Sequence, residues 1–118
     1  MMKLEKLVRA ILDNHLVEAR QWIADAQRTG MRFDSMPLPP LQSNQERVLA
    51  AGLVELLASR DEQMAPSWAG QIGSLPEPFF VGNRLKEMPR SAEEARTNGP
   101  EPLRRRNIFA SPNFLTIC

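Results

Sequence analysis

The chain of 118 residues is long enough for one ordinary domain and too short for two. Its 42% of hydrophobic and 25% of charged residues are typical of a globular protein. Because 15 Lys and Arg residues oppose 14 Asp and Glu residues, the formal net charge of +1 excludes a strongly basic nucleic-acid binder and an acidic tail protein.

The first two predicted elements are helices over about 3–12 and 15–29. In each, apolar residues recur at intervals of three and four, which is the pattern of one buried helix face. Asp13 and Asn14 offer a break and an N-cap for the second helix, and Gly30 offers a left-handed C-cap. A break this short predicts antiparallel neighbours or one bent pair.

A connector follows over 34–42, and it contains three prolines: Pro37, Pro39 and Pro40. Proline fixes its own φ angle and disfavours helix in the residue before it, so the connector is predicted to be extended. We expect Leu38 and Leu41 to anchor it on the surface of the first two helices.

The third predicted helix covers 44–60. Ser43 and Glu46 have the spacing of a capping box, in which each side chain satisfies an amide of the first turn. The helix is apolar around most of its circumference, which is typical of a central, buried helix. Gly52 inside it costs about 1 kcal/mol against alanine, and the expected compensation is the close approach of another helix.

The segment after residue 64 holds seven of the ten prolines. We expect an extended stretch over 76–80, with Phe79 and Phe80 on opposite sides if it is a strand. A second capping box at Ser91–Glu94 predicts a helix to about residue 97. Gly99, followed by proline, is expected to end that helix in a left-handed conformation.

These elements predict an all-α fold in a single domain covering 1–118. Three helices (about 3–12, 15–29 and 44–60) form the core within residues 1–62. The proline-rich C-terminal half, 63–118, carries too much apolar surface to be disordered, so we expect it to wrap around the core as short helices and extended segments.

The one cysteine, Cys118, excludes an internal disulfide and a four-cysteine zinc site, and it fits a reducing compartment. The longest apolar stretch, 48–58, is about half a membrane span and contains Glu55. No signal peptide is recognisable at the N-terminus. We therefore expect a cytoplasmic protein that contacts neither a membrane nor a metal.

Catalytic motifs are weak in this sequence. The single histidine, His15, and Cys118 could serve a hydrolase or transferase only if the fold brought an acid or a base beside them. Neither the dinucleotide-binding G-x-G-x-x-G pattern nor the P-loop pattern occurs. We predict no catalytic residue and no cofactor.

The run Arg104-Arg105-Arg106 is the dense basic feature, and it has two interpretations. The arginines could contact nucleic-acid phosphates, with an affinity that falls as salt rises. Alternatively, they cap helix C-termini and form ion pairs, which the near-neutral charge of the whole chain favours. Three carboxylates are candidates for such pairs: Glu77, Glu87 and Glu101.

The aromatic residues of the C-terminal half also have two interpretations. They could pack under the wrapping segment as core, which is the usual fate of apolar groups in a small domain. Part of the set could instead be an exposed anchor for another protein, because Trp, Phe, Met and Arg are enriched in interfaces. The set consists of Trp68, Phe79, Phe80, Phe109 and Phe114.

Four sequence segments together resemble a group of small uncharacterised bacterial proteins: ARQWIADA (19–26), AAGLVELLASR (50–60), PEPFFV (76–81) and PLRRRNIFASPNFLT (102–116). That group shares a helical first half, a PEPFF segment and a PLRRRN-type C-terminal stretch. The resemblance implies no activity, cofactor or functional residue. Small bacterial proteins of this build include accessory partners such as antitoxin-like subunits.

Our leading hypothesis is a non-enzymatic cytoplasmic accessory module that binds another protein or a second copy of itself. The predicted partner-binding residues are Trp68, Phe79, Phe80, Arg104, Arg105, Arg106 and Phe109. The first alternative is a nucleic-acid-binding protein that uses Arg104 to Arg106, and the second is a small hydrolase or transferase.

Overall fold

The computed structural model describes residues 3–38, 40–81 and 87–111. These residues form six helices and a two-stranded sheet, so the prediction of a mainly helical fold is confirmed. The sheet was not predicted. The elements in chain order are α1 (Leu4–Leu12), α2 (Leu16–Thr29), α3 (Asn44–Arg60), α4 (Ser67–Gly70), β1 (Phe79–Phe80), α5 (Pro89–Asn98), α6 (Glu101–Arg104) and β2 (Ile108–Phe109).

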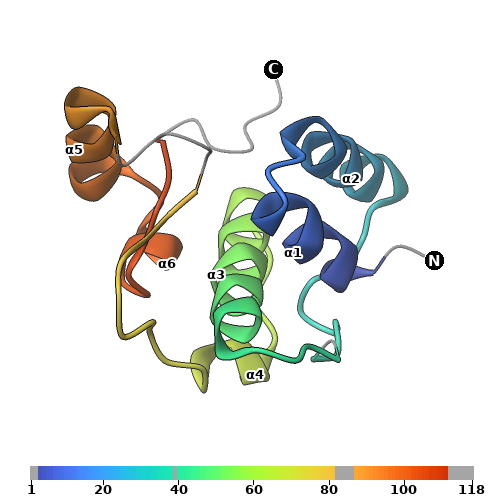
Figure 1. Ribbon diagram of the computed structural model, residues 1–118. Coiled ribbons are helices and arrows are strands. Elements are labelled where there is room, and N and C mark those ends of the chain that lie inside the picture. Colours follow the sequence, from blue (N-terminus) through green and yellow to red (C-terminus); the bar gives the residue numbers. More distant parts are fainter. Residues whose placement is uncertain (1–2, 39, 82–86, 112–118) are drawn as a thin grey trace.

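Helix α3 lies at the centre of the molecule, with α1 and α2 on one side and α5, α6 and the strands on the other (Figure 1). From Val48 to Ala58 every residue except Glu55 is buried, as expected for a helix that is apolar all round. The apolar core also takes residues from beyond position 64: Ala69, Leu75, Val81, Leu103, Ile108 and Ala110. No helix in the described ranges is long and apolar enough to cross a membrane.

Of the three caps predicted for α2 and α3, two are confirmed. Gly30 ends α2 in the left-handed conformation, with φ 67°. The Ser43 hydroxyl accepts the Glu46 amide at 3.1 Å and caps α3. The predicted N-cap of α2 is wrong, because His15 occupies that position without a side-chain cap bond. Asn14 takes a left-handed φ of 61° and makes the break between α1 and α2.

Close packing of α6 against α3 explains Gly52. A Cβ added at Gly52 would lie 2.6 Å from Cδ2 of Leu103, a side chain that is completely buried. The predicted close approach of another helix is therefore confirmed, and α6 is that helix. The absent side chain lets the two helices meet at this point.

Helix α5 differs from its prediction at both ends. It begins at Pro89 instead of after Ser91, because proline at the first position presets the helical φ angle. Gly99 follows it with an extended backbone, φ −64° and ψ 166°, so the predicted left-handed cap is wrong. Glycine is needed here for space, since an added Cβ would lie 2.5 Å from the Ala95 carbonyl oxygen and 2.6 Å from that of Ala110.

The strands β1 and β2 are parallel, with Phe79 opposite Ile108 and Phe80 opposite Phe109. The Val81 amide extends the ladder by donating to the Phe109 carbonyl at 2.8 Å. Successive side chains of a strand point to opposite faces. Accordingly, Phe79 and Ile108 belong to the core side, whereas Phe80 and Phe109 stack on the other side.

Candidate functional site

The last residue of the arginine run, Arg106, is engaged inside the protein. Arg106 is 4% exposed and forms an ion pair with Glu55 of α3. Its guanidinium also donates to the carbonyl oxygens of Ala69 at 2.8 Å and Pro102 at 3.0 Å. The Nε atom of Arg106 is buried without a hydrogen-bond partner among the described residues.

The two preceding arginines also bond to other groups of the protein, although the Arg105 side chain is half-exposed. Arg105 pairs with the same Glu55 carboxylate, and Arg104 donates to the Gly99 carbonyl at 2.6 Å. Burial alone would raise the pKa of Glu55, but the hydrogen bonds and charges of Arg106 and Arg105 outweigh burial and hold it below its ordinary value. This geometry supports a structural role for the run.

The carboxylate that binds Arg105 and Arg106 is Glu55, which was not among the partners predicted from the sequence. It lies about 50 residues away along the chain, on a different helix. The available signal was its position as the one charged residue inside the apolar stretch of α3. A carboxylate that is largely removed from water requires a partner, and the only dense group of cations in the sequence is the arginine run.

Trp68 and Phe79 are both half-buried and pack against the core. The indole N–H of Trp68 donates to the Met36 carbonyl at 2.8 Å. This bond holds the connector between α2 and α3 against α4. Within the described chain, therefore, both aromatic side chains contribute to the fold.

Phe80 and Phe109 form the remaining aromatic pair of the predicted site. Their ring centroids are 5.3 Å apart and tilted by 36°. The guanidinium of Arg96, on α5, lies 5.1 Å from the Phe80 ring centroid, within the range of a cation–π contact. Both rings are half-buried, and neither belongs to the main apolar core. Phe114 and Cys118 lie outside the described residues.

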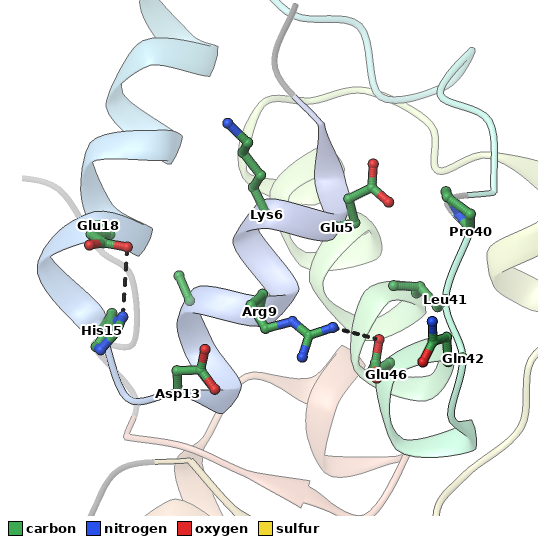
Figure 2. A pocket seen from close by; sticks show the side chains of 11 residues that line it. Glu5, Lys6, Arg9, Asp13, His15, Glu18, Pro40, Leu41, Gln42 and Glu46 are labelled. Carbon is green, nitrogen blue, oxygen red and sulfur yellow. Dashed lines mark ion pairs between the residues drawn. The ribbon is translucent and has the colours of Figure 1, made fainter.

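Three adjoining hollows surround α1. The first, which we call the charged hollow, has a volume of about 480 Å³. Figure 2 shows α1 at its floor, the start of α2 on one side, and the connector with the first turn of α3 on the other. Its lining consists of Glu5, Lys6, Arg9, Ala10, Asp13, His15, Glu18, Pro40, Leu41, Gln42 and Glu46.

One ion pair and one histidine–carboxylate contact lie within the charged hollow. Arg9 lies 3.8 Å from the Glu46 carboxylate, and His15 Nδ1 lies 3.7 Å from the Glu18 carboxylate (Figure 2). Among the described residues, no serine, threonine or cysteine lines this hollow, so it supplies no hydroxyl or thiol nucleophile to His15.

The second hollow, which we call the apolar hollow, has a volume of about 450 Å³ and lies at the N-terminal end of α1. It shares Glu5 and Pro40 with the charged hollow. Leu38 in its wall is 49% exposed, so the prediction that Leu38 anchors the connector is wrong. The other lining residues are Lys3, Leu4, Met31, Arg32, Ser35, Met36 and Pro37.

The chain between α2 and α3, which forms one wall of the apolar hollow, is held by hydrogen bonds from Gln63 and Trp68. The Gln63 side chain accepts the Phe33 amide at 2.8 Å and donates to the Met31 carbonyl at 3.0 Å. Together with the Trp68–Met36 bond, these contacts fix the wall of the hollow while its methionines remain half-buried. The third hollow, about 780 Å³, follows the groove between α1 and α2 and is lined by Lys6, Ala10, Glu18, Gln21, Trp22, Asp25, Thr29 and Met31.

The sequence interpretation did not identify these hollows. The sequence predicts two amphipathic helices and an extended connector over these residues, and neither pattern indicates a depression between them. The charged hollow and the apolar hollow are depressions because the connector runs beside α1, and Gln63 and Trp68 hold part of that connector in place. In the described ranges, no group of three or more His, Cys, Asp or Glu side chains is arranged to hold a metal ion.

Comparison with known proteins adds no assignment. No family model matches the chain, and no curated protein or solved structure shows a significant match.

Proposed function

We propose that this protein is a non-enzymatic interaction module of the cytoplasm, which binds a segment of another protein in the hollows around α1. The observation that carries the proposal is the apolar hollow, where Leu38 stays 49% exposed beside the half-buried Met31 and Met36. Exposed apolar side chains that line a depression are typical of interaction sites. Methionine adapts its shape to a bound side chain, which suits such a surface.

The wall of the apolar hollow is partly preorganised for binding. Because Gln63 and Trp68 hold the backbone at Met31, Phe33 and Met36, a partner would not have to order that part of the wall. Preorganisation of this kind lowers the entropic cost of association. The exposed Arg32 in the wall donates hydrogen bonds to the Asp34 carboxylate at 2.8 and 3.2 Å, and these bonds lower the pKa of Asp34. The positive charge of Arg32 beside the apolar surface is thereby balanced by Asp34.

The aromatic pair Phe80 and Phe109, with Arg96, remains a second candidate contact surface for the same function. Aromatic and arginine side chains are enriched at interfaces, and both rings are only half-buried. The arginine run gives less support to the nucleic-acid alternative, since each of the three guanidinium groups is already bonded within the protein.

Site-specific photo-crosslinking tests the proposal. A benzophenone amino acid would replace Leu38 in one variant and Val17 in a control variant, and both would be expressed in the native host. Val17 is a matched control because it is 80% exposed, lies on α2 and lines none of the three hollows. We expect a discrete protein adduct from position 38 and none of the same mass from position 17.

A competition experiment makes the result specific. Untagged wild-type protein should suppress the adduct from position 38, whereas an untagged Leu38→Asp variant should not. The absence of any adduct at position 38, or the same adducts from both positions, would contradict the proposed function. Suppression by both competitors would also contradict it, since binding would then not depend on the apolar hollow.

A further inference from the structure

The charged hollow carries an excess of carboxylates. Four of its lining side chains are acidic and two are cationic, which gives a net charge of −2 with His15 neutral. The acidic residues are Glu5, Asp13, Glu18 and Glu46, and the cationic ones are Lys6 and Arg9. One of the two cations, Arg9, already faces Glu46 at 3.8 Å.

The other three carboxylates remain available to bind a cationic group. In the described part of the chain, Glu5 and Asp13 form no ion pair, and Glu18 faces only the imidazole of His15, at 3.7 Å. The side chain of Glu18 is 74% exposed, so it can reach a bound group. Carboxylates in a depression focus the local potential and attract cations. An acidic partner would meet repulsion at the same place.

We infer that the partner segment carries a lysine or arginine for the charged hollow and an apolar side chain for the apolar hollow. This inference rests on the proposed function and adds the chemistry of the partner. The two hollows adjoin, since Glu5 and Pro40 line both. One continuous peptide can therefore contact both hollows.

The length of α1 sets the spacing of the two groups in the partner. Lys3 and Leu4 lie at the apolar end of α1, and Asp13 lies just beyond its other end. The nine residues of α1 cover about 13 Å at 1.5 Å per residue. An extended peptide advances about 3.3 Å per residue. The cationic residue and the apolar residue are thus separated by about four positions in an extended segment.

Selection from a random dodecapeptide phage library on the immobilised full-length protein tests this inference. We expect the enriched peptides to combine lysine or arginine with a leucine, isoleucine, methionine or phenylalanine about four positions away. The best peptide would then be synthesised and titrated by fluorescence anisotropy. Its Kd should rise when salt is added, because attraction between charges at the surface is screened.

A double variant and a matched control locate the binding charge. Asp13→Asn with Glu18→Gln should raise the Kd of the peptide about tenfold, since two opposite charges at the interface are lost. The control, Glu93→Gln with Glu94→Gln, removes the same charge from exposed positions of α5 and should leave the Kd unchanged. Circular dichroism would verify that both variants keep the helical fold.

The outcomes separate this inference from the proposed function. Enrichment of peptides without cations, no enrichment at all, or an equal Kd for the double variant and the wild type would overturn the inference. If crosslinking at position 38 still succeeds in those cases, the interaction function stands and only the partner chemistry is wrong. If crosslinking fails while cationic peptides bind, the charged hollow binds peptides but the apolar hollow is not the native docking site.

Discussion

At the scale of single residues, the most consequential side chain is the buried Arg106. A cation taken out of water costs several kcal/mol unless charge and hydrogen bonds replace its hydration. Glu55 supplies the charge, and the carbonyl oxygens of Ala69 and Pro102 supply two further bonds. Arg106 thereby joins α3, the end of α4 and α6 at one point.

Removing the counter-charge should destabilise the fold strongly. For Glu55→Gln we expect a loss of about 3 kcal/mol in the free energy of unfolding, because the buried Arg106 keeps its charge without a carboxylate. Urea unfolding followed by circular dichroism would measure the change. As a control, Glu93→Gln removes only an exposed pair with Arg96 at 3.7 Å and should cost less than about 0.5 kcal/mol. Equal effects of the two substitutions would refute the role given to Glu55.

The same pair predicts a pH dependence. Because the pKa of Glu55 is lower in the folded protein than its ordinary value, Glu55 contributes its full stability above the pKa of the unfolded chain. That contribution is lost as the pH falls through the folded pKa. The difference in unfolding free energy between wild type and Glu55→Gln should thus be largest near neutral pH and shrink below about pH 4.

At the scale of elements, α6 and the end of α5 are placed by close backbone approaches. Gly52 lets Leu103 reach α3, and Gly99 sits between the carbonyl oxygens of Ala95 and Ala110. Neither position needs a left-handed backbone. The requirement is space, so an added methyl group has to displace a neighbour.

The two glycines should therefore respond to alanine with different magnitudes. Gly99→Ala should destabilise the protein by about 3 kcal/mol, because both obstacles are backbone atoms. Gly52→Ala should cost about 1 kcal/mol, since better helix propensity offsets part of the clash with Leu103. Gly73→Ala meets no atom within 4 Å and should change the free energy by about 0.5 kcal/mol or less. Thermal and urea unfolding would rank the three, and a different order would contradict the packing argument.

The connector depends on one indole bond. Trp68→Phe keeps the ring but removes the donor to the Met36 carbonyl, at a cost of about 1 kcal/mol. Amide hydrogen exchange over 31–38 should become faster as the wall of the apolar hollow loosens. Trp22→Phe is the matched comparison, since it removes an equivalent bond to the Lys3 carbonyl at 3.0 Å and should act at the start of α1 instead. Unchanged exchange over 31–38 in Trp68→Phe would count against this role.

At the scale of the whole molecule, stability is concentrated at α3 and falls toward α5. Ten residues of α3 are buried, whereas α5 buries only Ala92 and Ala95, and both lie outside the main apolar core. Figure 1 shows α5 at the edge of the molecule, away from α1 and α2. Local opening requires less free energy where little apolar surface is buried.

Native-state hydrogen exchange should reveal this gradient. We expect the amides of α5 to exchange through local opening, well before global unfolding, and those between Val48 and Ala58 to exchange only when the whole protein unfolds. Mass spectrometry at low denaturant concentration would measure both. Equal protection of α5 and α3 would mean that α5 is held by more than the contacts described.

The parts of this fold that depend on local pattern could be predicted from the sequence. Helices over 44–60 and 15–29 follow from apolar periodicity, and the Ser43 and Gly30 caps follow from neighbouring residues. The pairing of β1 with β2 and the Glu55–Arg106 contact could not, because they join residues far apart in the chain. The hollows depend on the same kind of contact, since Gln63 and Trp68 place the connector only after the helices have packed.

Gly99 lies against Ala110, and this contact bears on where the chain can become longer. The Val81 amide is bonded to Phe109, so the chain leaves and rejoins the molecule at almost the same place. Helix α5 (Pro89–Asn98) therefore lies between two points of the chain that come close together in space. Doubling the length of a loop closed in this way costs only about 0.6 kcal/mol in closure entropy. The protein can thus accept a longer α5, or another element in its place, without a change in the packing around α3.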